Sequence, residues 1–96
     1  MQITNITNVK PSLKAGATVA TCSVSVNGMT IRGVRILQND RGYWTNMPTY
    51  TINKEDGTKA YIPYVTIEDK EEQQDFKNQV VREFLKWQSE LFLEEA

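Results

Sequence analysis

The spacing of apolar residues changes once along this chain, near residue 68. Before that point apolar and polar residues alternate in short runs, as in the stretch 17–26 with Ala20, Cys22, Val24 and Val26. After it, apolar residues recur at steps of three or four, at Phe76, Val80, Phe84, Trp87 and Leu91. Alternation predicts strands with one buried face, and the longer step predicts an amphipathic helix. We therefore expect an α+β fold, an antiparallel sheet of about five strands (about 2–67) with one long C-terminal amphipathic helix (about 68–94) packed on it.

The chain is expected to form a single domain over residues 1–96. A domain of this length buries a modest share of its surface, about 60% or slightly more, so a second subunit would add stability. The sequence contains no internal repeat or low-complexity segment.

A turn and a bulge organise the central strands in the predicted sheet. Asn27-Gly28 tolerates positive φ at both central turn positions, which is the strongest short signal for a hairpin. On the return strand, 29–38, Met29 and Ile31 have the opposite parity to Val34 and Ile36. A β-bulge at Gly33, between the two pairs, would keep all four residues inward. The same bulge would place Arg32 and Arg35 together on the outward face.

The remaining elements carry weaker signals. Residues 2–9 are rich in β-branched side chains, but the apolar positions Ile3, Ile6 and Val9 lie three apart rather than two. Short strands are predicted at 43–47 and 58–67, with turns at 38–42 and 53–57 and with Gly57 suited to a left-handed position. Pro48 is expected to end ladder pairing or to lie at a sheet edge, and Pro63 indicates an edge or a bulge. Two residues compete as the N-cap of the helix, Thr66 and Asp69.

The residues available for chemistry are few. The chain has no histidine and one cysteine, which leaves no standard zinc site and removes the commonest general base. Cys22 falls on the inward face of its strand and is interpreted as a small core residue rather than a nucleophile. No Gly-rich phosphate loop and no calcium loop occur in the sequence. We expect neither enzymatic activity nor a cofactor.

Charge is distributed unevenly along the chain. Residues 1–67 contain seven Lys/Arg and three Asp/Glu, whereas residues 68–96 contain four Lys/Arg and nine Asp/Glu. A basic sheet with exposed tyrosines could neutralise and stack a nucleic acid strand; the candidates for stacking are Tyr43, Tyr50, Tyr61 and Tyr64. The acidic start of the helix suits the positive end of the helix dipole, which is a structural reason for that cluster.

The sequence carries no apolar stretch typical of a signal peptide and no run long enough for a membrane span. With a single cysteine, no internal disulfide can form. We expect a cytoplasmic protein without a membrane partner.

The central part of the chain resembles the family of stage V sporulation protein G (SpoVG), the septation-regulator proteins. The resemblance covers about residues 2–88 and depends on a strand with an Ile-Arg-Val-Ile type run, a turn with Gly, an aromatic strand that ends in Met-Pro, and a later Asp-Gly. In this sequence those features are Val34–Leu37, Gly42, Trp44, Met47-Pro48 and Asp56-Gly57. The resemblance implies that Trp44 and Met47 are packing residues of a short core strand.

The SpoVG resemblance also implies a small homodimer that binds DNA or RNA and regulates gene expression. In this chain the helix starts with an acidic run, IEDKEE, where family members usually have basic residues. Phosphate contacts are therefore assigned to nine of the eleven lysines and arginines of the chain, which are Arg32, Arg35, Arg41, Lys54, Lys59, Lys70, Lys77, Arg82 and Lys86.

The acidic run supports an alternative hypothesis. The chain could be a protein-interaction module, an inhibitor or a decoy, that keeps the fold without nucleic-acid binding. Its docking surface for a basic protein would then consist of Glu68, Asp69, Glu71, Glu72 and Asp75.

Overall fold

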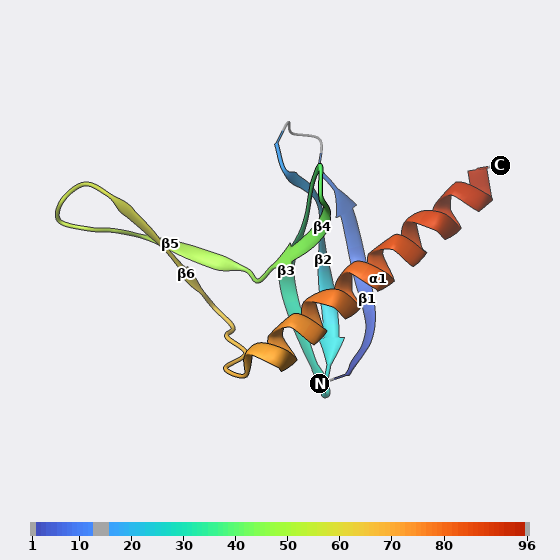
Figure 1. Ribbon diagram of the computed structural model, residues 1–96, viewed down its shortest axis with the longest axis horizontal. Helices are drawn as coiled ribbons and strands as arrows, with labels where there is room; N and C mark the ends of the chain where they lie inside the picture. The colour runs from blue at the N-terminus through green and yellow to red at the C-terminus, as the bar shows by residue number, and fades with distance from the viewer. Residues whose placement is uncertain (1, 13–15, 96) are drawn as a thin grey trace.

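The fold is α+β, as predicted, with six strands in two antiparallel sheets and one C-terminal helix (Figure 1). A computed structural model describes residues 2–12 and 16–95. The strands and the helix, in chain order, are β1 (Ile3–Pro11), β2 (Thr18–Val26), β3 (Met29–Asn39), β4 (Gly42–Asn46), β5 (Thr49–Asn53), β6 (Lys59–Pro63) and α1 (Lys70–Glu95). The first four strands form one sheet in sequence order, and β5 and β6 form the other. Helix α1 crosses one face of the four-stranded sheet, and we call the opposite face the outer face.

The hairpin between β2 and β3 turns at Asn27-Gly28, as predicted. Both residues have positive φ, 50° and 74°, and Val26 pairs with Met29 across the turn. Mirror-image turns of this kind match the twist of paired strands, which explains why the pair Asn-Gly marks the hairpin.

The bulge predicted at Gly33 is confirmed. Cys22 pairs with Val34 and Val24 pairs with Ile31, so one residue of β2 lies opposite two residues of β3. Gly33 has a φ of +80°, in the region that favours glycine. The bulge keeps Ile31, Val34 and Ile36 buried on one face, but the prediction for Met29 was wrong. Met29 is 56% exposed because it lies at the end of the hairpin, beyond the cover of the helix.

Two further bulges explain the spacing of apolar residues in β1. Register shifts lie between Ile3 and Asn5 and between Thr7 and Lys10, each adding one residue to β1 relative to β2. Because each extra residue reverses the alternation, Ile3, Ile6 and Val9 all contact the core although they are three apart.

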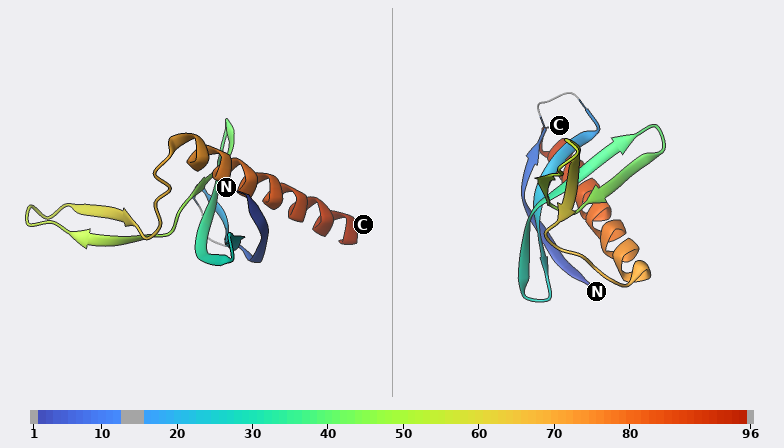
Figure 2. Two further views of the ribbon diagram at one scale, coloured as in Figure 1. Left: turned by 90° about the horizontal axis from the view of Figure 1, so that it is seen from below. Right: turned by 90° about the vertical axis from the view of Figure 1, so that its left-hand side faces the viewer.

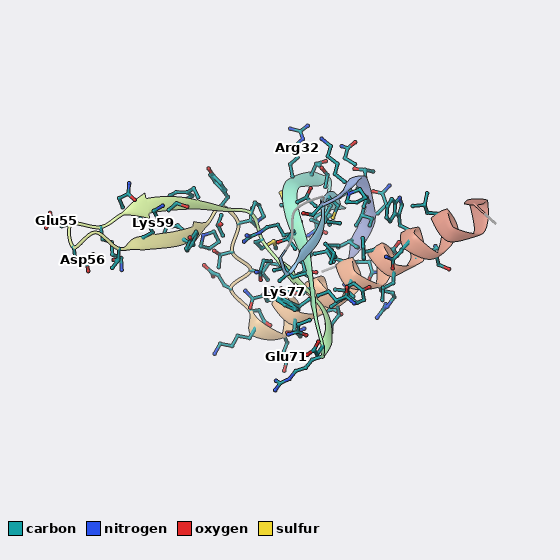
Figure 3. All side chains as sticks on the ribbon, turned by 90° about the horizontal axis from the view of Figure 1, so that it is seen from above. Arg32, Glu55, Asp56, Lys59, Glu71 and Lys77 are labelled. Carbon is teal, nitrogen blue, oxygen red and sulfur yellow. The ribbon has the colours of Figure 1, made fainter. Side chains whose placement is uncertain are left out.

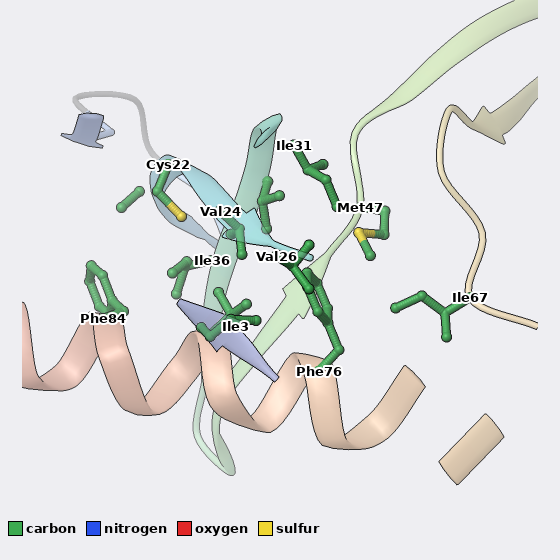
Figure 4. Packing of buried hydrophobic residues seen from close by; sticks show 13 residues of the cluster. Ile3, Cys22, Val24, Val26, Ile31, Ile36, Met47, Ile67, Phe76 and Phe84 are labelled. Carbon is green, nitrogen blue, oxygen red and sulfur yellow. The ribbon is translucent and has the colours of Figure 1, made fainter. Parts of the chain in front are cut away.

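Helix α1 supplies the other half of the core. Phe76, Val80 and Phe84 are buried in the core, as the helical spacing predicted. Figure 4 shows Phe76 and Phe84 directed from the helix toward the sheet. A buried hydrogen bond fixes the helix to β1: the backbone N–H of Ile3 donates to Oε1 of Gln79 at 3.0 Å. The helix continues past the sheet at its C-terminal end, where Leu91 is 41% exposed (Figures 1 and 2).

The start of α1 resolves the choice between the two N-cap candidates. Oδ1 of Asp69 accepts the backbone N–H of Glu72 at 3.0 Å, the bond expected of an N-cap residue. The helix therefore begins at Lys70 rather than at residue 68. Within the described part of the chain, no helix has the length and apolar character that a membrane span requires.

Residues 49–63 form a hairpin that projects from the body of the molecule, and we call this hairpin the arm (Figures 1 and 2). The sequence analysis missed strand β5 and extended the last strand to residue 67, whereas β6 ends at Pro63. Pro48 and Pro63 lack the N–H that continued ladder pairing needs, so they lie at the base of the arm, where the sheet ends. Gly57 turns the tip with a φ of +87°.

The Gly33 bulge provides a direct test of this architecture. A Cβ at Gly33 would meet Pro48 Cβ at an ordinary 3.5 Å, so Gly33→Ala suffers from backbone strain rather than from a clash. We expect Gly33→Ala to lower the free energy of unfolding by about 1–2 kcal/mol. Gly33→Asn should lower the free energy of unfolding by a smaller amount, because asparagine tolerates positive φ better than alanine. Urea unfolding followed by tryptophan fluorescence measures both variants, and equal stability of wild type and Gly33→Ala would contradict the assigned bulge.

Candidate functional site

The cations predicted from the sequence are distributed over several parts of the molecule. Arg41 lies in the β3–β4 turn, where its backbone N–H donates to Oδ1 of Asn39 at 2.8 Å. Lys54 and Lys59 lie on the arm, and Arg32 lies on the side of the sheet away from the helix (Figure 3). The remaining helical cations are Lys70, Lys77, Arg82 and Lys86, all exposed except Lys77, which is half-buried. No single basic patch collects the predicted set.

Two of these cations, Arg35 and Lys77, line one hollow. The hollow lies where strands β3 and β4, the base of the arm and the first turns of α1 meet, and we call it the arm-base cleft. Its volume is about 500 Å³. The polar and aromatic residues that line it are Arg35, Asn46, Thr49, Tyr61, Thr66, Gln73 and Lys77. No carboxylate among the described residues lines the cleft.

Arg35 is positioned by the sheet. It pairs with Thr21 of β2 and with Asn46 of β4, and its neighbours in sequence, Val34 and Ile36, are buried on the helix side. Alternation along the strand therefore directs Arg35 to the outer face. It is half-buried there, beside the end of β4, where the chain leaves the sheet for the arm.

Lys77 is positioned by the packing of the helix on β4. The buried hydroxyl of Thr45 donates to the backbone carbonyl of Lys77 at 3.4 Å, which holds this turn of the helix against the strand. Gln73 lies one turn earlier on the same side of the helix and lines the same cleft. Lys77 also lines a neighbouring hollow with Tyr43, Trp44 and other residues, so it lies between two depressions.

Arg32 lies apart from Arg35, although both extend from the outer face. Arg32 occupies the bulge opposite Ser23 and is exposed. It lines a separate, mainly apolar hollow with Met29, Pro48 and Tyr64. Arg32 and Arg35, expected from the sequence to lie together, therefore line two different hollows.

The carboxylates at the start of the helix line a hollow next to the arm-base cleft, and Val65 and Thr66 line both hollows. Glu68, Asp69 and Glu72 line another hollow of about 440 Å³, on the side of the hairpin end of β2 and β3. Asp69 caps the helix, and Oδ2 of Asp75 accepts Nε2–H of Gln79 at 2.8 Å. Glu71 is exposed (Figure 3). Glu72 and Lys77 of the helix therefore line different, neighbouring hollows.

The tip of the arm is organised by Asp56. Its Oδ1 accepts the backbone N–H of Thr58 at 3.0 Å and the hydroxyl of Thr58 at 2.6 Å. These hydrogen bonds to Thr58 hold the pKa of the Asp56 carboxyl below its usual value. Lys54 closes the turn through its backbone, with its N–H donating to the carbonyl of Thr58 at 2.8 Å. The tip carries both signs of charge (Figure 3).

The arrangement offers little to covalent or metal chemistry. Cys22 is buried in the core, as predicted, and burial raises the pKa of its thiol to about 11. A thiol of this kind is protonated near neutral pH and is a poor nucleophile. Among the described residues, no three His, Cys, Asp or Glu side chains come together in a way that could hold a metal ion.

Sequence reasoning named Arg35, Lys77 and Tyr61 but missed that they share a cleft with Asn46 and Gln73. One signal was available: Gln73 and Lys77 are four apart, which places them on one side of a helix. The proximity of Arg35 depends on how the helix crosses the sheet, which no local pattern specifies.

Comparison with known proteins leaves the SpoVG resemblance without independent support. No protein-family model matches the sequence, and no curated protein matches it. The function must therefore be argued from the residues of the arm-base cleft and of the arm.

Proposed function

We propose that this chain is a nucleic-acid-binding regulatory protein that acts as a homodimer. The observation that carries the proposal is the arm-base cleft, where Arg35 and Lys77 line one hollow and no described carboxylate opposes them. The expectation that the protein regulates gene expression comes from the resemblance to the SpoVG family.

The chemistry of the cleft fits a phosphate-bearing ligand. Arginine presents a planar fork of donors to phosphate oxygens, and lysine adds a point charge. Both side chains are half-buried, and partly buried charges are screened less by salt than fully exposed ones. Asn46 and Gln73 add amide groups that can donate to phosphates or pair with base edges.

The acidic start of the helix is compatible with this proposal. Carboxylates weaken phosphate binding when they lie beside the cations, but Glu68, Asp69 and Glu72 line a different hollow. None of these carboxylates lines the arm-base cleft, which supports binding of a phosphate there.

The arm supports a homodimer. An isolated two-stranded hairpin is marginally stable in water, and β5 and β6 have each other as their principal contacts. The register puts Tyr50 and Ile62 opposite each other, and likewise Ile52 and Ala60, so these four residues form one apolar face of the arm. Ile52 is 43% exposed on that face. A second copy of the chain that covers this face would stabilise the arm.

A second candidate function is docking of a basic protein. The hollow lined by Glu68, Asp69 and Glu72 also contains Val26, Met29 and Ile31, a mixture that suits a cationic segment with an apolar side chain. This candidate becomes the leading one if the protein fails to bind nucleic acid, and a pull-down with and without charge reversal at Glu68 and Glu72 then tests it.

Nucleic-acid binding is tested with two variants that each remove two positive charges. Arg35→Gln/Lys77→Gln should weaken binding to short DNA and RNA oligonucleotides at least roughly tenfold, because two charge-assisted contacts are lost. The salt dependence should also fall, by about one phosphate contact for each cation. The matched control is Arg82→Gln/Lys86→Gln, which changes exposed residues outside the cleft. Fluorescence anisotropy at low and moderate salt measures both.

Two results would contradict the proposal. Equal losses in both double variants would show that the arm-base cleft is not the site. Flat titrations of the wild-type protein at low salt would remove nucleic-acid binding altogether.

The homodimer is tested by a pair of neighbouring substitutions on β5. Ile52→Glu places a charge on the apolar face of the arm, whereas Thr51→Glu places the same charge on the other face. Light scattering after gel filtration should give about twice the chain mass of 11.0 kDa for wild type and for Thr51→Glu, and a smaller mass for Ile52→Glu. A monomeric wild-type protein at micromolar concentration would refute the dimer.

A further inference from the structure

We propose that the arm-base cleft binds an unpaired strand of nucleic acid, with one base stacked on Tyr61 and its phosphates held by Arg35 and Lys77. This inference rests on the proposed function and specifies the form of nucleic acid that the site takes. Its basis is the position of an exposed aromatic ring in a hollow that also contains two cations.

The arm has two chemically different faces. Opposite the apolar face, the register aligns Thr51 with Tyr61 and Asn53 with Lys59. These residues form a polar face that contains one aromatic ring and one cation. The face proposed for dimer contact and the face proposed for the ligand are therefore on opposite sides of the same hairpin.

Tyr61 is available for stacking. Its side chain is 69% exposed, and none of the ring contacts between described residues involves it. Tyr64 is equally exposed, at 68%, but its ring packs on Tyr50 with centroids 4.9 Å apart, and it lines the hollow of Arg32 instead. Tyr61 therefore differs from Tyr64 in two respects. It lines the arm-base cleft, and its ring does not pack on another described ring.

The size of the cleft favours an unpaired nucleotide. The arm-base cleft is an open hollow of about 500 Å³, a volume that can receive one nucleotide. A base can lie flat on a tyrosine in such a hollow only when it is free of its partner strand, because a duplex keeps its bases stacked inside. A duplex could still contact the cations, but it could not use the ring.

Further cations and aromatic rings lie on both sides of the cleft. Lys59 lies two residues before Tyr61 on the polar face of the arm, and Lys77 leads to a neighbouring hollow that contains Trp44. Cations that follow the backbone, interleaved with rings that stack bases, are typical of proteins that bind single strands without strict sequence preference. Tyr61, Arg35 and Lys77 share the arm-base cleft, with Lys59 further out on the arm and Trp44 in the neighbouring hollow, so a strand has several groups to contact.

The test is a double-mutant cycle between the ring and the base, measured by fluorescence anisotropy at low salt. Wild type and Tyr61→Ala are titrated with a single-stranded oligonucleotide and with a strand of the same length made only of abasic sugar–phosphate units. Tyr61→Ala should bind the natural strand roughly 5- to 150-fold more weakly, the loss expected for one base–aromatic stack. On the abasic strand, wild type and variant should bind equally, because no base remains to stack.

Controls identify the contribution of the ring. Tyr61→Phe keeps the aromatic face and should bind like wild type, and Tyr64→Ala removes an equally exposed tyrosine outside the cleft and should also bind like wild type. Circular dichroism of each variant verifies the fold. Equal losses in Tyr61→Ala on natural and abasic strands would overturn the stacking proposal.

Two further ligands, a duplex and a free mononucleotide, show whether a negative result concerns the unpaired-strand inference or the proposed function on which it rests. If a duplex of the same sequence binds as tightly as the single strand and Tyr61→Ala matches wild type, the protein binds nucleic acid and only the unpaired-strand inference fails. If a free mononucleotide competes as well as the oligonucleotide, the ligand is a nucleotide rather than a strand. If no nucleic acid binds, the proposed function and this inference fail together.

Discussion

The bulge at Arg32 and Gly33 is the constraint on which the rest of the structure depends. A strand that alternates strictly would put either Ile31 or Val34 and Ile36 on the wrong face of the sheet. The extra residue in β3 corrects the register, so Ile31, Val34 and Ile36 are all buried in the core that the sheet shares with helix α1. The same correction directs Arg35 to the outer face, beside Asn46 and the base of the arm. The same bulge therefore determines the position of the core residues of β3 and of Arg35 in the candidate site.

The arm leaves the main sheet because hydrogen-bonded pairing between strands is interrupted at two prolines. Pro48 follows β4 and Pro63 closes β6, and neither can donate to a neighbouring strand, so the second hairpin leaves the sheet. Once detached, the hairpin exposes both of its faces, one apolar and one polar with Tyr61 and Lys59. The proposed dimer and the proposed ligand would account for one face each.

The sequence predicted local features well because they depend on neighbouring residues. The Asn27-Gly28 turn, the bulge at Gly33 and the buried stripe of α1 all follow from conformational preference or periodicity. It failed where placement depends on the tertiary fold. Met29 has the spacing of a core residue but lies beyond the cover of the helix and is exposed. The arm-base cleft brings together residues more than 40 positions apart in the sequence, from Arg35 to Lys77. Strand β5 was missed because its pairing depends on where the chain leaves the first sheet.

The measurement that most directly tests the central claim is a titration of the ¹⁵N-labelled protein with a short single-stranded oligonucleotide, followed by NMR. The account predicts that backbone amide signals change most around the arm-base cleft, at Arg35, Asn46, Tyr61 and Lys77. Changes concentrated instead at the exposed helix positions Arg82 and Lys86, or spread evenly over the surface, would contradict the assignment of this cleft as the site.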